Sequence, residues 1–188
     1  PAGNAGNWIG RRTSPWIQPS GPACWPWGLS AIAIESVDGS KVHDVRVESI
    51  QVRQVMTPLF IRLGNRNRWK DKDRQGEIAG VHVRGLKAEN VVSPCVLSGI
   101  PGLYIRDVTL EDVSMRYHDT LEALTIEEAI PELEEGYPEF WNFGDLPAFG
   151  LYARHVDGLT LRGFEAVPRS VNTRQKVVFD DVLNLAIE

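Results

Sequence analysis

The stretch Asp44-Val45-Arg46-Val47-Glu48-Ser49-Ile50 decides the fold of this chain, because close copies of it recur along the sequence. The copies are Gly80–Leu86, Asp107–Val113, Gly158–Phe164 and a shortened last one, Val182–Ile187. Each alternates apolar and polar residues, which is typical of a strand with one buried face. Such a short unit cannot bury its face alone, but stacked copies can. The repeats therefore predict an all-β fold, a solenoid of parallel strands with about five rungs, one for each copy.

A second, more apolar strand precedes each copy. These strands are Ala31–Glu35, Leu59–Leu63, Cys95–Ser98, Gly150–Arg154 and Val177–Asp180. Equivalent residues of successive copies (Val45, Val81, Val108, Leu159 and Leu183) lie 36, 27, 51 and 24 residues apart. The short spacings give the length of one rung, and the long ones predict insertions at 64–77 and 116–147 within a solenoid domain at 29–188. The second insertion has a helical pattern, so we expect a short helix near Leu121–Ala129.

Residues 1–28 do not fit the repeat and contain four of the six tryptophans, with Pro, Gly and Ser between them. We expect an irregular arm or cap, because the terminal rung of a solenoid exposes apolar core. The same exposed end predicts self-association, so the chain is expected to form a homo-oligomer. The chain starts without Met and has no apolar signal-peptide core, which suits removal of a leader before Pro1, and these residues do not predict the compartment.

Composition argues against several classes of function. The net charge of −5 disfavours non-specific nucleic-acid binding, and there is no run of 18 apolar residues to span a membrane. Cys24 and Cys95 are too few for a disulfide framework, and Cys95 has the place of a core residue. No cofactor and no metal site within one chain is predicted, because the histidines lack metal-binding spacing. A metal site assembled across subunits stays open.

Stacking also predicts rows of side chains across the rungs. The row Glu48, Arg84, Glu111 and Arg162 alternates in charge, so every neighbouring pair should attract. A second outward row should contain His82, as a solvated histidine, together with Arg46, Thr109, Thr160 and Asn184.

Several linked motifs resemble the C-terminal coils of bacterial family 28 glycoside hydrolases, the polygalacturonase-like proteins. The motifs are Thr57–Arg66, Ser98–Gly102, Tyr137–Glu139, Phe143–His155 and Val178–Val182. The resemblance runs from about Gly28 to the end of the chain. It implies a right-handed parallel β-helix, an acidic pectin-type polysaccharide as the ancestral substrate, and a secreted or periplasmic location.

The chain departs from this family where the family's chemistry lies. The Asn-Thr-Asp and Gly-His-Gly segments are absent. Asp180-Asp181 is an Asp-Asp pair, but it lies in the last coil rather than an early one. Phe60–Leu63 matches the family's Arg-Ile-Lys segment only in part, with Leu63 in place of the lysine. The chain resembles the family's C-terminal half without its catalytic coils.

The outward face of the apolar strands carries the candidate site. Its carboxylates, Glu35 and Asp180, are the catalytic candidates, but four rungs separate them by about 19 Å. Inverting glycoside hydrolysis needs roughly 6.5–9.5 Å, so the two cannot act as one pair within a chain. The candidate substrate-binding residues are Arg62, Asn65, Arg66, Trp69, Ser98, Tyr152 and Arg154. The arginines among them could hold a sugar carboxylate.

Three functions remain open. The first is a hydrolase of the polygalacturonase-like class that acts on an acidic polysaccharide or a small-molecule substrate. The second is a non-catalytic fragment that binds glycan or assembles. The third is a scaffold that has acquired a different ester hydrolysis, with or without a metal, at a subunit interface.

Overall fold

The computed structural model describes residues 28–68, 74–117, 130–169 and 174–188. Over these residues the fold is all-β, and the paired strands form one nine-stranded sheet in which every strand pairing is parallel. The strands are β1 (Gly28–Ser36), β2 (Lys41–Leu63), β3 (Glu77–Val91), β4 (Cys95–Ser98), β5 (Ile105–Glu111), β6 (Ser114–Tyr117), β7 (Ala148–Arg162), β8 (Glu165–Val167) and β9 (Gln175–Ile187). The prediction of an all-β fold with parallel strands is confirmed.

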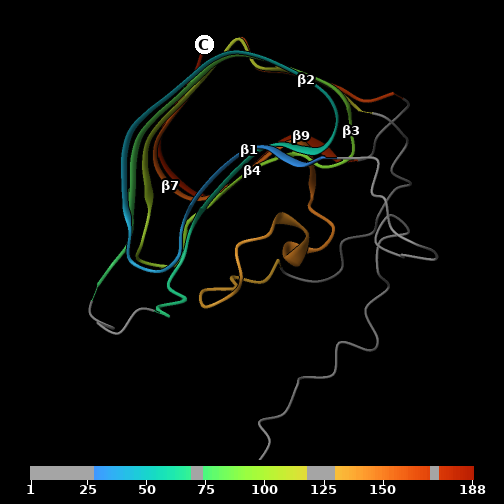
Figure 1. Cartoon of the computed structure of the whole chain (residues 1–188). Helices are drawn as coiled ribbons and strands as arrows, with labels where there is room; N and C mark the ends of the chain where they lie inside the picture. The colour runs from blue at the N-terminus through green and yellow to red at the C-terminus, as the bar shows by residue number, and fades with distance from the viewer. Residues whose placement is uncertain (1–27, 69–73, 118–129, 170–173) are drawn as a thin grey trace, which may run out of the picture.

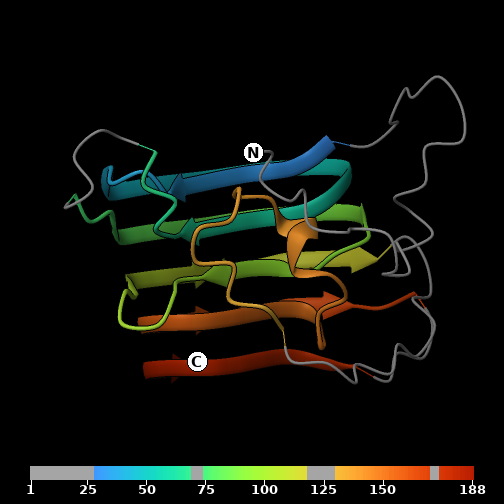
Figure 2. The same cartoon turned by 90° about the horizontal axis from the view of Figure 1, so that it is seen from below.

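The strands lie in layers. Strand β1 pairs with the second half of β2, and the first half of β2 pairs with β3. Below them, β3 pairs with β5 and β6, β4 lies between β2 and β7, and β9 pairs with β7. Seen along the stack, the strands overlap in one looped outline (Figure 1), and the view at 90° shows them one below another (Figure 2).

The register follows the repeats closely. Val45 pairs with Val81, Val81 with Val108, and Val108 with Leu159, as predicted. The charged row Glu48, Arg84, Glu111 and Arg162 is in register too, and Arg84 Nε lies 3.6 Å from a Glu111 carboxylate oxygen.

The last repeat is shifted by two residues from its predicted place. Leu159 pairs with Leu185 rather than Leu183, and Ala186 rather than Asn184 follows Thr160 in the row that contains His82. The reason is that Asn184 occupies a bend with φ 51°, in line with Gly158 at φ 81°.

Residues with positive φ bend the long strands and lie in register from layer to layer. One bend row contains Asp44, Gly80, Asp107, Gly158 and Asn184. A second contains Ser49, Gly85, Asp112 and Gly163. Gly, Asn and Asp tolerate left-handed backbone better than other residues. The bends explain why the two strands expected in one repeat merge into one long strand, as in the 15 residues of β7. In the 23 residues of β2, one copy of the repeat runs on into the apolar strand of the next.

The apolar core lies inside the stack. The core row Ile34, Ile61 and Leu97 continues through Ala153 to Phe179. Leu151 also faces the core, but it lies two residues before Ala153 and pairs with Cys95. Burial raises the pKa of the Cys95 thiol to about 12, which agrees with an inert core residue.

A second apolar cluster lies on the outer face of the apolar strands. The 3-10 helix η2 (Phe140–Phe143) belongs to the predicted second insertion, and Phe140 and Phe143 each pack edge-on against Phe60. The other buried members of this outer cluster are Met56, Val96, Leu146, Ala148 and Tyr152. The insertion therefore covers part of the face on which the sequence placed the candidate site.

The predicted arm at 1–28, apart from Gly28, and the predicted helix near 121–129 lie outside the described residues. Nothing tests the predicted domain boundaries, which stay predictions. No helix of the described residues is both long and apolar enough to cross a bilayer.

Replacement of Leu97 by alanine should destabilise the protein by about 2–5 kcal/mol, because the side chain is fully buried and the truncation leaves a cavity. Leu183→Ala is the matched control, since Leu183 is 47% exposed and should change stability by no more than about 0.5 kcal/mol. Urea unfolding measures both variants. Equal losses would contradict the interior placement of Leu97.

Candidate functional site

Five sequence-predicted site residues form one row across the layers. Glu35 pairs with Arg62, Arg62 with Ser98, Ser98 with Arg154, and Arg154 with Asp180. The structure thus brings neighbouring members of the row together but leaves Glu35 and Asp180 at its opposite ends. Tyr152 belongs to the next row, between Val96 and Val178.

Arg62 is a buried anchor for the second insertion. It is only 2% exposed, and its Nη1 donates to the Ser98 hydroxyl at 2.6 Å and to the Gly99 carbonyl at 3.0 Å. Its Nη2 donates to the carbonyls of Glu132 and Leu133 at 2.9 and 2.7 Å. Burial lowers the pKa of the guanidinium to about 10. These bonds occupy the group that the sequence assigned to substrate.

Arg154 holds two carboxylates that come from distant parts of the chain. Its Nε lies 2.6 Å from Asp180 Oδ2, and its Nη1 lies 3.1 Å from Glu132 Oε1. Nη1 also donates to the Ile130 carbonyl at 2.9 Å. The Tyr152 hydroxyl donates to Asp180 Oδ2 at 3.2 Å. The Arg154 side chain is 10% exposed, whereas those of Asp180 and Glu132 are 45% and 34% exposed, so solvent reaches both acids.

His155 continues this cluster on the other side of Glu132. Its Nδ1 lies 2.6 Å from Asp181 Oδ2, and its Nε2 lies 3.1 Å from Glu132 Oε2. The Tyr104 hydroxyl donates to the same Asp181 oxygen at 2.5 Å. The hydrogen bond from Tyr104, and after it the one from His155, holds the pKa of Asp181 below its ordinary value. The bond to Asp181 also raises the pKa of Tyr104. We call Arg154, His155, Glu132, Asp180 and Asp181 the carboxylate cluster.

Of the other predicted residues, Arg66 lies near Glu35. Partial burial raises the pKa of Glu35, and the charge of Arg66 opposes the shift. Arg66 itself forms an ion pair with Asp38, and its guanidinium carbon lies 5.3 Å from the centre of the Tyr137 ring.

Asn65 is exposed, and its side-chain oxygen accepts a hydrogen bond from Asn67, while its backbone N–H donates to the Glu134 carbonyl. Trp69 lies outside the described residues. This end of the row contributes no residue to the carboxylate cluster.

Sequence reasoning missed Glu132, His155, Asp181 and Tyr104 as site residues. His155 and Asp181 have φ of 50° and 56° and stack as a bend pair, one position after the pair Arg154 and Asp180. Alignment of Arg154 with Asp180 in the sequence would have found that pair. No repeat pattern places Glu132, because it lies in the insertion.

Over the described residues, no group of three or more His, Cys, Asp or Glu side chains has the arrangement of a metal site. The cluster itself contains carboxylates, an imidazole and a guanidinium, and the phenols of Tyr104 and Tyr152 bind its two aspartates. No family model, no curated protein and no solved structure matches this chain.

Replacement of Tyr104 by phenylalanine should raise the pKa of Asp181 toward its ordinary value of 3.8, because the phenol is the first contributor to the lowered value. Carbon-13 NMR of the labelled carboxyl groups measures the titration. Asp181 stabilises the fold above that ordinary pKa, and the contribution is lost as the pH falls through its lowered pKa.

Tyr137→Phe is the matched control, since Tyr137 packs on Arg66 and not on Asp181. An unchanged Asp181 titration in Tyr104→Phe would contradict the hydrogen bond.

Proposed function

We propose that this chain is a hydrolase that cleaves glycosidic bonds at the carboxylate cluster. One observation carries the proposal: Asp180 and Glu132, from the last layer and from the insertion, bind the same Arg154 guanidinium. The two carboxyl groups can therefore lie no farther apart than the width of the guanidinium plus the lengths of the two contacts. This span is comparable with the roughly 6.5–9.5 Å between the carboxyl groups of inverting glycosidases.

Asp180 is the proposed general base. It accepts hydrogen bonds from Arg154 and Tyr152, so its carboxylate is oriented, and it is 45% exposed, so a water molecule can reach it. The water attacks the anomeric carbon and transfers a proton to Asp180 as the bond to the leaving oxygen breaks.

Glu132 is the proposed general acid, with His155 as its positioning residue. Asp181 fixes the proton of the imidazole on Nδ1, so Nε2 faces Glu132. A hydrogen bond at that contact requires one proton between Nε2 and Glu132. The leaving oxygen takes this proton, and the water adds its remaining hydroxyl to the sugar.

The resemblance to family 28 glycoside hydrolases supplies the rest of the proposal. The parallel layers and the ordered motifs support a right-handed parallel β-helix of that type, with an acidic polysaccharide as substrate. Exposed Leu183, Leu185 and Ile187 on β9 support the proposed homo-oligomer, because they leave the last layer partly uncovered.

A non-catalytic role in glycan binding or assembly is the second candidate. It is favoured by the way the insertion covers the row, since Ser98 and Arg62 are 0% and 2% exposed. In this alternative Arg62 and Arg154 only fasten the insertion, through hydrogen bonds to its carbonyl groups.

Asp180→Asn and Glu132→Gln should each lower kcat on polygalacturonate by about 10²–10⁴, the usual contribution of a general acid or base. Release of reducing ends measures turnover. Glu35→Gln is the matched control and should keep wild-type activity, because Glu35 lies four layers from Asp180.

Hydrolysis that survives both substitutions, or is lost in Glu35→Gln instead, would refute the assignment. An unmodified protein that binds oligogalacturonide without cleaving it would establish the second candidate.

A further inference from the structure

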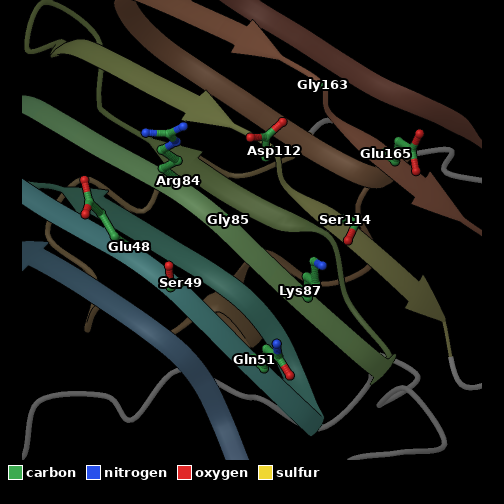
Figure 3. Close-up of a pocket in the computed structure, with 10 residues that line it drawn as sticks. All are labelled: Glu48, Ser49, Gln51, Arg84, Gly85, Lys87, Asp112, Ser114, Gly163 and Glu165. Carbon is green, nitrogen blue, oxygen red and sulfur yellow. The ribbon is translucent and has the colours of Figure 1, made fainter.

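A polar groove runs across the layers at the bend row that contains Ser49, Gly85, Asp112 and Gly163. Its volume is about 690 Å³, within the range of small-molecule sites. Figure 3 shows its side chains coming from four successive stretches of chain, β2, β3, β5–β6 and β7–β8. None of the residues that line it belongs to the carboxylate cluster.

The floor of the groove is hollow because two of its four positions are glycine. Gly85 and Gly163 have φ of 68° and 59°, a conformation that side chains rarely adopt. A Cβ added at Gly163 would lie 3.1 Å from Asp112 Oδ1. The two positions therefore stay without side chains, and the backbone is open to a ligand there.

Two rows of polar side chains form the walls. Glu48 and Arg84 stand on one side of the bend. On the other side stands the row Gln51, Lys87, Ser114 and Glu165. Within the described part of the chain, no hydrogen bond or ion pair engages the side chains of Gln51, Lys87 or Glu165. The row thus presents an amide, an ammonium, a hydroxyl and a carboxylate, about 4.8 Å apart.

This mixture of groups selects the ligand. A polyanion would meet the carboxylates of Glu48, Asp112 and Glu165, and a polycation would meet Arg84 and Lys87. Sugar hydroxyls can donate to the carboxylates and accept from the cations in the same complex. A chain of sugar rings also suits a groove that repeats its polar groups from layer to layer. We propose that this groove binds a linear, uncharged oligosaccharide, at a site separate from the carboxylate cluster.

The test is nitrogen-15 NMR of the whole chain with millimolar cellotetraose, xylotetraose, maltotetraose, galactotetraose or tetragalacturonate. At least one of the four neutral sugars should shift the amide signals of Gly85 and Gly163 more strongly than tetragalacturonate does. The signals of Gly102 and Gly144 serve as references, because both lie in other loops. Absence of these shifts with all four neutral sugars, or preference for tetragalacturonate, would overturn the proposal.

Variants locate the binding. Lys87→Ala and Glu165→Gln should each weaken binding of the neutral sugar about tenfold, the usual effect of losing a hydrogen bond to a charged group. Lys41→Ala removes an equal charge outside the groove and should bind normally. Asp180→Asn should also bind normally, so failure of the hydrolase proposal and failure of this one are distinguishable. Equal weakening by Lys41→Ala would refute the location.

Discussion

The structure depends on one constraint: residues with left-handed backbone must recur in register where the strands bend. Each bend lets one strand continue around the layer without a break, so that its backbone keeps pairing with the layers above and below. The row from Asp44 to Asn184 meets the constraint with Asp, Gly and Asn only. Bulky β-branched residues would be strained at these places. The bend positions, as much as the alternating apolar residues, thus set which side chains meet across the layers.

The same register creates both candidate sites. It stacks Arg154 on Asp180 and His155 on Asp181, so two acidic residues of one strand reach a guanidinium and an imidazole of the neighbour. The insertion completes that cluster with Glu132. At the bend row that contains Ser49 and Asp112, Gly85 and Gly163 have no side chains, which leaves a groove. Both candidate sites are therefore built from rows of residues, since a single strand carries neither.

Most of the layer pairing could be predicted from the sequence, because Val45, Val81, Val108 and Leu159 mark equivalent places in copies of one pattern. The last copy was misaligned because Leu183 and Leu185 both fit that pattern, and only the bend at Asn184 decides between them. The row from Glu35 to Asp180 was predictable for the same reason. Glu132 was not, since its place depends on how Arg62 and Arg154 bind an insertion that has no repeat. Burial of Arg62 likewise follows from tertiary packing rather than from sequence.

The most direct test of the stacked register is the set of NOEs between methyl groups of Val45, Val81, Val108, Leu159 and Leu185 in a methyl-labelled sample. Adjacent members of this row lie on neighbouring strands about 4.8 Å apart, and members two layers apart are separated by about twice that distance. The account predicts strong NOEs between adjacent members in this order, with none between Val45 and Leu159. Strong NOEs that join the row in another order, or their absence between adjacent members, would contradict it.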